Sequence, residues 1–294
     1  MTKTDGIRAT PGVDVVAHVT PDSACWKYSS LIVLDMNAGA SFQMPTDESE
    51  WIALPIRGSF GVSTGVTDFA LEGRRSVFSR VSDFAYVGRD DLLHISSVAG
   101  GRIALCGARA RRQLPARYGP ATDVPVEVRG AGPSSRQVNN FASPHGFATD
   151  RIIAVEVLTP GGNWSSYPPH KHDEARDGES VLEEIYYFEI DGGATGSSPG
   201  PGGYQRVYSS GKDRQIDVTA EVHSGSVVLI PYGYHGPTMA APGYNLYFLN
   251  VLAGPGEGRT MAFCDDPSHA WVRTSWTGQL IDPRVPMTST EERP

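Results

Sequence analysis

Short apolar segments rich in β-branched and aromatic residues recur along the whole chain, and turn residues separate them. Examples are residues 29–36 (SSLIVLDM), 151–158 (RIIAVEVL), 183–190 (EEIYYFEI) and 244–252 (YNLYFLNVL). The chain of 294 residues holds 33 glycines and 22 prolines, which supply the breaks between these segments. One break, the Gly-, Ser- and Pro-rich stretch 191–203, predicts a surface loop between two strands. The pattern is typical of an all-β sandwich or barrel and leaves little room for long helices.

The two halves of the chain show the same order of segments. Residues 31–62 and 152–190 each run from an apolar strand through a glycine-containing turn, a polar segment and an acidic loop to a second apolar strand. Such internal similarity predicts a duplicated β-barrel. The basic stretch 108–124 contains two prolines and is interpreted as the connector. We therefore expect a first barrel in residues 1–123 and a second barrel in residues 124–294.

Net charge and the length of the apolar runs disfavour several classes of protein. A formal charge of −8 offers no general basic face for nucleic acid. The apolar runs are far shorter than the roughly 20 residues of a membrane helix, and the first residues lack the apolar segment of a signal peptide, so we expect a cytoplasmic protein. Cys25, Cys106 and Cys264 match neither a disulfide framework nor a zinc-finger spacing. We expect a small-molecule partner, and exposed sheet edges favour a homo-oligomer.

The segment SSYPPHKHDE, residues 165–174, places His170 and His172 one residue apart. In an extended strand, side chains at positions i and i+2 share a face, so both imidazoles can aim at one point while Lys171 points away. Imidazole is the commonest side-chain ligand for metal ions in proteins. In the first half of the chain the corresponding positions lie near Phe42 and Met44. The first barrel is therefore not expected to hold a metal in the same way.

Two further segments of the second half can complete a metal site. Glu183 and Glu184 stand at the head of an apolar strand, and alternation places Glu184 on one face with Tyr186 and Phe188. The segment GSVVLIPYGYHGP presents His235 after a strand and a Pro-x-Gly turn. The predicted ligand set is His170, His172, Glu184 and His235. Mixed nitrogen and oxygen ligation suits a divalent ion, with Zn or Mn favoured and Fe also compatible.

At these residues the chain resembles the cupin superfamily, whose first motif is a glycine, His-x-His and a glutamate, and whose second is Gly-x5-Pro-x-Gly followed by a histidine. The matching residues are Gly162, His170, His172 and Glu184 in the first motif, and Gly225, Pro231, Gly233 and His235 in the second. Two departures stand out. The stretch DEARDGESVLE, residues 173–183, lengthens the gap before the glutamate, so Glu183 and Glu184 compete as the ligand; Glu184 is preferred because it directly precedes IYYFEI. His235 also follows its glycine one residue sooner than usual.

A more specific resemblance covers residues 124–256 and continues faintly into the first half. The segments GAGPSSRQVNN (130–140) and GGNWSSYPPHKHD (161–173) are similar to those of the 5-deoxyglucuronate isomerases of inositol catabolism. These enzymes are bicupins, that is, proteins of two cupin barrels. The resemblance implies an aldose–ketose isomerisation of 5-deoxy-D-glucuronate to 2-deoxy-5-keto-D-gluconate.

An aldose–ketose isomerisation explains the value of a metal site. The reaction moves a proton between adjacent carbons through an enediolate, and a divalent cation that coordinates both oxygens stabilises the negative charge. Two other functions use the same ligand set. One is an Fe(II)-dependent cupin dioxygenase, and the other is a bicupin that binds sugar acids without catalysis.

Candidates for proton transfer and substrate binding lie on strands beside the proposed site. The catalytic candidates are Glu183, Tyr186, Gln205 and Tyr247, with Glu183 offering the best intrinsic chemistry for a base although alternation points it away from Glu184. A metal-bound water is the rival base. Arg136 and Arg206 are the candidates for the substrate carboxylate, because the planar guanidinium suits a carboxylate.

Overall fold

The computed structural model describes residues 10–191 and 202–292. In this part of the chain β-strands predominate, and the two α-helices, α1 (Pro21–Ala24) and α2 (Trp271–Ser275), are each little more than one turn long. No helix among these residues is long and apolar enough to span a lipid bilayer. The mostly β class predicted from the sequence is confirmed. Residues 192–201 of the predicted loop 191–203 lie outside the described ranges.

The first β-unit comprises the strands up to residue 119. Antiparallel pairing gives the order β1-β2-β8-β4-β6-β9, with β5 paired to β4 and β7 paired to both β3 and β4. The bounds are β1 (Val13–Val19), β2 (Ser29–Met36), β3 (Ser41–Pro45), β4 (Ser49–Ser63), β5 (Asp68–Arg74), β6 (Phe84–Val87), β7 (Leu92–Ser96), β8 (Gly101–Arg109) and β9 (Arg117–Gly119). The short 3-10 helix η1 (Ala121–Asp123) follows.

The second β-unit consists of two facing sheets and a small hairpin. The interface sheet has the order β10-β11-β12-β22-β17-β20, and the outer sheet has the order β19-β18-β21-β14-β23 with β13 also paired to β21. The interface sheet contains β10 (Val126–Arg129), β11 (Arg136–Ala142), β12 (Ile153–Thr159), β17 (Glu183–Asp191), β20 (Val227–Ile230) and β22 (Asn245–Ala253). The outer sheet contains β13 (Trp164–Ser165), β14 (His170–Lys171), β18 (Gly203–Tyr208), β19 (Asp217–Val222), β21 (Tyr234–Met239) and β23 (Cys264–Asp265). The hairpin is β15 (Asp173–Arg176) with β16 (Glu179–Val181), and the 3-10 helix η2 (Gly132–Ser134) precedes β11.

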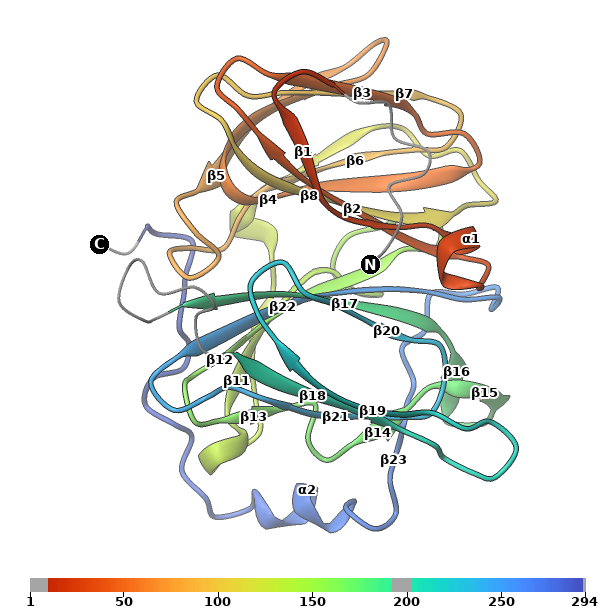
Figure 1. Ribbon diagram of the computed structural model, residues 1–294, viewed down its shortest axis with the longest axis vertical. Helices are drawn as coiled ribbons and strands as arrows, with labels where there is room; N and C mark the ends of the chain where they lie inside the picture. The colour runs from red at the N-terminus through yellow and green to blue at the C-terminus, as the bar shows by residue number, and fades with distance from the viewer. Residues whose placement is uncertain (1–9, 192–201, 293–294) are drawn as a thin grey trace.

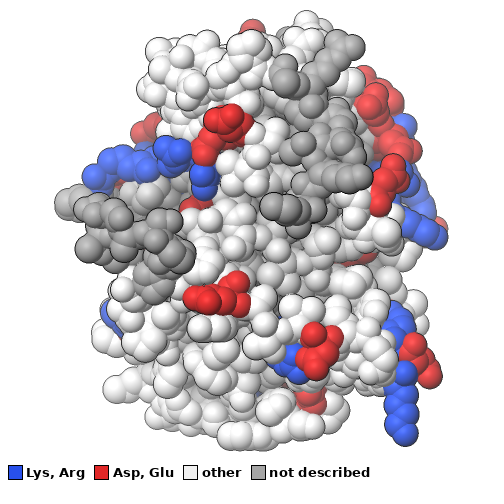
Figure 2. Space-filling model, viewed as in Figure 1, with Lys and Arg blue, Asp and Glu red and all other residues white. Residues whose placement is uncertain are grey.

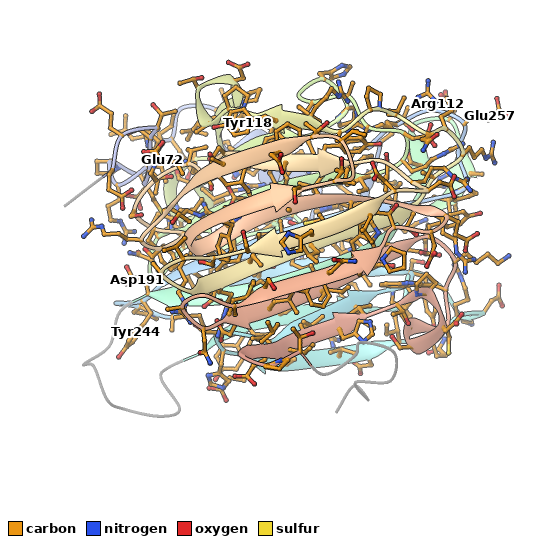
Figure 3. All side chains as sticks on the ribbon, turned by 90° about the horizontal axis from the view of Figure 1, so that it is seen from above. Glu72, Arg112, Tyr118, Asp191, Tyr244 and Glu257 are labelled. Atoms are coloured by element: carbon orange, nitrogen blue, oxygen red, sulfur yellow. The ribbon has the colours of Figure 1, made fainter. Side chains whose placement is uncertain are left out.

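The two units are stacked, with β17 and β22 of the second unit lying against β2 and β8 of the first (Figure 1). Seen from above, strands cross the molecule in broad layers, with Glu72 and Tyr118 near one edge and Asp191 and Tyr244 near another (Figure 3). Figure 2 shows acidic and basic side chains in small scattered groups on one face, some of one sign and some of both.

Side-chain alternation in β17 separates two hydrophobic cores. Ile185 and Tyr187 face the first unit and join a cluster that includes Leu31 and Val33. The neighbouring Tyr186 and Phe188 face the interior of the second unit. A strand buried on both faces must be apolar on both, which explains the continuous run IYYF. The same alternation decides which of the two glutamates at the start of β17, Glu183 or Glu184, points into the interior of the second unit.

A buried ion pair crosses the interface between the units. Arg74 of β5 donates to the Glu156 carboxylate of β12, and their side chains are 0% and 1% exposed. Glu156 also accepts hydrogen bonds from Tyr247 Oη at 2.9 Å and from Asn139 Nδ2 at 3.1 Å. A buried charge is tolerated when it is paired and hydrogen-bonded in this way. The network therefore stabilises the contact between the two units. It lies outside the interior of the second unit.

Candidate metal centre

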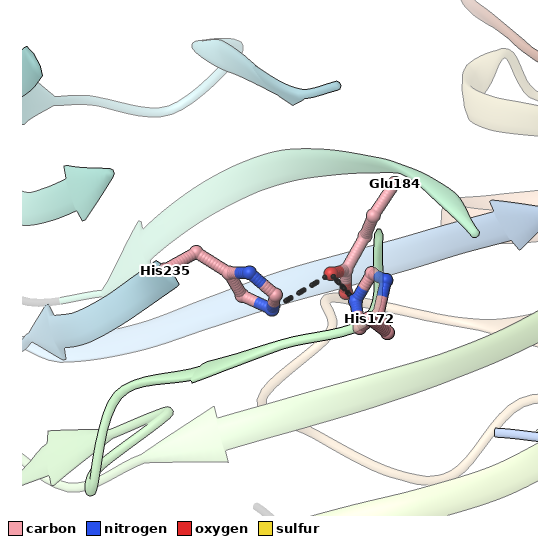
Figure 4. Close-up of side chains that lie close together, drawn as sticks. All are labelled: His172, Glu184 and His235. Atoms are coloured by element: carbon pink, nitrogen blue, oxygen red, sulfur yellow. Dashed lines mark hydrogen bonds and ion pairs between the residues drawn. The ribbon is translucent and has the colours of Figure 1, made fainter. Parts of the chain in front are cut away.

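His172, Glu184 and His235 converge inside the second β-unit. His172 follows β14, Glu184 lies near the start of β17 and His235 lies in β21, so each comes from a different strand region. Their ligand atoms all lie within 4.8 Å of one another, and all three residues are buried. His172 Nε2 lies 2.9 Å and His235 Nε2 lies 3.1 Å from the same atom, Glu184 Oε2 (Figure 4).

Backbone carbonyls set the tautomer of these imidazoles. His172 Nδ1 lies 3.1 Å from the Leu182 carbonyl oxygen, and His235 Nδ1 lies 3.4 Å from that of Gly233. A proton on Nδ1 that donates to a carbonyl leaves Nε2, the nitrogen next to Glu184, as the atom that could bind a metal ion once it carries no proton. This arrangement is typical of histidines that bind metals.

The polar atoms of this group fit a metal ion. Among the described residues, His235 Nε2 is buried and has no hydrogen-bond partner of good geometry, although it points toward the Glu184 carboxylate. Asn250 Nδ2 donates to Glu184 Oε1, which fixes the carboxylate from its other side. Two imidazole nitrogens and a carboxylate oxygen are ligands that divalent transition metals accept. This group could therefore bind a metal.

Electrostatics favour an ionised Glu184. Burial alone would raise the pKa of its carboxyl, but the electrostatic influence of the neighbouring His235 and the hydrogen bond with His172 outweigh burial and hold that pKa below its usual range. For His172, burial lowers the pKa, whereas the hydrogen bond to Glu184 and its charge have the larger combined effect and raise it. The carboxylate thus carries the negative charge that a cation site needs.

His170 lies next to this group without belonging to it. It pairs with His235 in the β14–β21 register, and their ring centroids are 4.4 Å apart. Its ring lies 6.4 Å from that of His172, and its Nδ1 lies 3.4 Å from the Pro168 carbonyl oxygen. Burial and the neighbouring histidines lower the pKa of His170 well below its usual value, so the ring is neutral. Three of the four predicted ligands are therefore brought together, and the fourth is adjacent.

A cavity of about 560 Å³ is lined by His170, His172 and Glu184. Its apolar wall includes Val138, Val155, Val157 and Phe248 from the interface sheet. Tyr186 lies on the same wall, with its hydroxyl 3.0 Å from Ser166 Oγ. The cavity is of the size and mixed polarity that small-molecule sites have.

Among the described residues, three arginine side chains also line the cavity. Arg129 forms an ion pair with Glu127, and Arg273 forms one with Asp265. Arg136 is buried, donates to the Ser134 carbonyl oxygen at 3.0 Å, and has no acidic partner among the residues that the structure describes. Burial and the like charges of Arg129 and Arg273 lower the pKa of Arg136 to about 9, so the guanidinium is charged at neutral pH. A buried, unpaired cation facing a cavity is suited to an anionic ligand.

Asn250 and Arg273 also line this cavity, although neither is among the site residues predicted from the sequence. Asn250 follows Phe248 by two positions in β22, so alternation could have placed it beside Glu184. Arg273 belongs to α2, far along the chain, and no local pattern signals its position.

Glu183, the residue with the best intrinsic chemistry for a base, contacts the first unit. Its carboxylate accepts the backbone N–H groups of Lys27 at 2.7 Å, Tyr28 at 2.8 Å and Ser29 at 3.0 Å, on the side of the first unit. Because Glu183 and Glu184 are neighbours in a strand, they point to opposite faces. Glu183 therefore joins the two units and points away from Glu184.

Replacing Glu183 with glutamine should lower stability and spare activity. The amide would turn a donor toward backbone N–H groups, so we expect a loss of about 1–3 kcal/mol in the free energy of unfolding. The turnover number should change by less than about threefold, because no proton transfer depends on this carboxyl. Denaturant unfolding and steady-state kinetics of the same preparation measure both. A large fall in turnover with unchanged stability would restore Glu183 as the base.

Three other candidates also lie outside the cavity lining among the described residues. Tyr247 faces the first unit and donates to Glu156 at 2.9 Å, because it is on the opposite face of β22 from Phe248 and Asn250. Gln205 is fully buried, and its Oε1 accepts a hydrogen bond from Thr238. Arg206 forms an ion pair with Asp217 at the surface. Strand membership alone placed these residues near the site, whereas their side-chain directions take them elsewhere.

Comparison with known proteins places this architecture in a family. A profile of the KduI/IolB family matches residues 3–272. The chain belongs to the KduI/IolB family. The 5-deoxy-glucuronate isomerase of Geobacillus kaustophilus is 41% identical over 264 residues, covering 88% of this chain and 91% of that protein. The enzyme of the same name from Bacillus subtilis strain 168 is 38% identical over 265 residues, covering 89% of this chain and 93% of its own length.

Solved structures support the same placement. The crystal structure of an IolB-like protein from Salmonella typhimurium LT2 matches with a TM-score of 0.81 and 33% identity, covering 91% of this chain and 97% of that one. The oxalate decarboxylase of Lactobacillus farciminis matches with a TM-score of 0.62 at 12% identity, covering 90% of this chain and 87% of that one. At that identity the likeness concerns the fold alone. This KduI/IolB family member thus has a cupin-type fold.

Proposed function

We propose that this KduI/IolB family member is a metal-dependent aldose–ketose isomerase that converts 5-deoxy-D-glucuronate to 2-deoxy-5-keto-D-gluconate. The observation that carries the proposal is the buried group of His172, Glu184 and His235, because His172 and Glu184 line a cavity that also holds Arg136, which has no acidic partner among the described residues. The relatives named 5-deoxy-glucuronate isomerase match most of the chain and supply the substrate class.

The metal ligands in this proposal are His172, Glu184 and His235, with the adjacent His170 as the fourth. A bound divalent cation supplies Lewis-acid stabilisation of the negative charge that develops on substrate oxygens. Zn and Mn are our first choices and Fe is compatible, since this donor set does not discriminate among them.

The chain's own residues bind and orient the sugar acid. Arg136, which lines the cavity, offers its guanidinium to the substrate carboxylate. The Tyr186 hydroxyl, held by Ser166, offers a hydrogen bond to a substrate oxygen near the ligands. The valines and Phe248 of the interface sheet keep water from the reacting carbons. With Glu183, Gln205 and Tyr247 directed elsewhere, Tyr186 is the remaining catalytic candidate from the sequence.

An anaerobic assay separates isomerisation from its rivals. Metal-loaded protein is incubated under nitrogen with 5-deoxyglucuronate in deuterated water, and exchange of the C2 hydrogen is followed by NMR. We expect exchange and ketose formation without oxygen. Oxygen consumption by the iron-loaded protein, with no anaerobic turnover, would instead favour a dioxygenase. Binding of the sugar acid without exchange would favour a non-catalytic bicupin.

We also propose that the chain is a bicupin with a degenerate first barrel in residues 1–123 and a metal-binding barrel in residues 124–294. The strand pairing supports this division, because β9 pairs within the first unit and β10 within the second. Within the described ranges, the His172–Glu184–His235 group is the one cluster suited to a metal. The end of the chain departs from a simple division, since the Val81 N–H of the first unit donates to the Ser289 carbonyl oxygen at 2.8 Å.

A further inference from the structure

The hairpin β15–β16 is the acidic insertion that lengthens the spacing between His172 and Glu184, and the function proposed above gives it no role. It is held by charged groups that are almost fully buried. The side chains of Lys171, Asp173 and Glu179 are 4%, 3% and 1% exposed. Lys171 Nζ donates to Asp173 Oδ1 at 2.7 Å and to Glu179 Oε1 at 2.8 Å. Removing a charge from water costs free energy, and buried charges are therefore paired. The pairing in this cluster fixes a defined geometry.

One carboxylate of the cluster reaches the turn that carries His235. Asp173 Oδ2 accepts the backbone N–H of Gly233 at 2.9 Å, and it also accepts Arg214 Nη2 at 2.8 Å. The carbonyl oxygen of Gly233 in turn faces His235 Nδ1 at 3.4 Å. Asp173 therefore fixes the N–H group of Gly233, and the carbonyl group of the same glycine orients the His235 ring.

Gly233 leaves this turn little freedom to rearrange. Its φ is +86°, and a Cβ at this position would lie 2.5 Å from the Tyr208 carbonyl oxygen. The glycine is therefore confined between Tyr208 on one side and Asp173 on the other. The hydrogen bond from the Gly233 N–H to Asp173 then defines the orientation of the segment that leads into β21.

The same hairpin also orients His172. Leu182 immediately follows β16. Its carbonyl oxygen lies 3.1 Å from His172 Nδ1, and its N–H donates to the His172 carbonyl oxygen at 2.9 Å. In this way one short insertion contacts the surroundings of two of the converging imidazoles. The contacts are made through the backbone of Leu182 and the side chain of Asp173.

We infer that Asp173 is a positioning residue for the metal centre: anchored by Lys171, it fixes the Gly233 turn and thereby the direction of His235 Nε2, while the hairpin that it begins fixes His172. The inference rests on the metal centre of the proposed function. It assigns the acidic insertion to the organisation of the ligands and gives it no contact with substrate. Loss of such outer contacts typically lowers metal affinity by about 10- to 100-fold.

The test uses Co²⁺ as the probe, because its visible absorption bands report ligand geometry. Asp173→Ala removes the acceptor of the Gly233 N–H, while Lys171 keeps Glu179 as its partner. We expect the Co²⁺ affinity, measured by competition with a chelator, to fall by about 10- to 100-fold, and the cobalt bands to change in position or intensity. Should this variant fail to fold, Asp173→Asn keeps the side-chain volume and replaces one acceptor oxygen by a donor.

Two control variants separate positioning from general damage. Arg214→Met removes the half-exposed partner of Asp173 but leaves the Gly233 bond, and Glu156→Gln breaks a comparably buried ion pair at the interface between the units. Both should retain the wild-type cobalt spectrum, and Glu156→Gln should lower the melting temperature of the metal-free protein.

The outcomes distinguish this inference from the proposed function. Wild-type cobalt binding with an unaltered spectrum and affinity in Asp173→Ala would overturn the positioning role alone. A wild-type protein that binds no cobalt would overturn the metal centre, and the inference with it.

Discussion

Replacing His172 with alanine should abolish tight binding of a divalent metal and reduce turnover by about 1,000-fold or more. The variant removes an Nε2 atom that lies 2.9 Å from Glu184 Oε2 in a buried site, so water cannot readily replace it as a well-placed ligand. Lewis-acid stabilisation contributes several kcal/mol to a transition state, and each 1.36 kcal/mol corresponds to about tenfold in rate. Metal content after dialysis and steady-state kinetics under nitrogen measure the two effects.

The matched control for this variant is His94→Ala. His94 lies in β7 of the first unit, where its Nδ1 is 3.3 Å from Ser63 Oγ and remote from the metal ligands. This variant should keep metal content and turnover close to those of the wild type. An His172→Ala protein that turns over substrate without metal would refute the proposed chemistry.

Replacing Arg136 with methionine should reduce kcat/KM by about 100-fold, mainly through a higher KM. The substitution keeps much of the side-chain volume and removes a buried charge that has no acidic partner in the described ranges. A hydrogen-bonded ion pair with a substrate carboxylate in such a site contributes about 3 kcal/mol. Metal binding should be unaffected, because Arg136 is no part of the ligand group.

Arg206→Met is the matched control for this prediction. Arg206 was the other arginine that the sequence offered for the carboxylate, and in the structure it pairs with Asp217 at the surface. Its replacement should change kcat/KM by less than about threefold, because exposed ion pairs contribute at most about 1 kcal/mol. If Arg206→Met were the damaging variant and Arg136→Met were neutral, the substrate carboxylate would have to bind elsewhere.

The parts of the site that sequence could predict are those governed by local periodicity. The period of two in β17 places Glu184 and Tyr186 on one face, and the structure shows both facing the cavity. The same rule points Glu183 to the other face, where it binds backbone N–H groups of the first unit. Chemical suitability as a base favoured Glu183, but the direction of the side chain decides what it can reach.

The parts that sequence could not predict depend on contacts between distant segments. Tyr247 is committed to Glu156 because the units stack, and no feature of its own strand shows that a partner lies beyond the sheet. Arg273 reaches the cavity because the chain after β22 passes along the cavity before it enters α2. The link from Asp173 to Gly233 joins residues 60 positions apart, and it becomes visible only when the hairpin is seen against the turn.

A crystal structure of the metal-loaded protein with a substrate analogue, with anomalous scattering recorded at the absorption edge of the metal, tests the central claim most directly. We predict an anomalous peak within bonding distance of His172 Nε2, the Glu184 carboxylate and His235 Nε2, with an oxygen of the analogue completing the coordination. An ion bound elsewhere, or one enclosed by protein ligands with no position open to the analogue, would contradict the account.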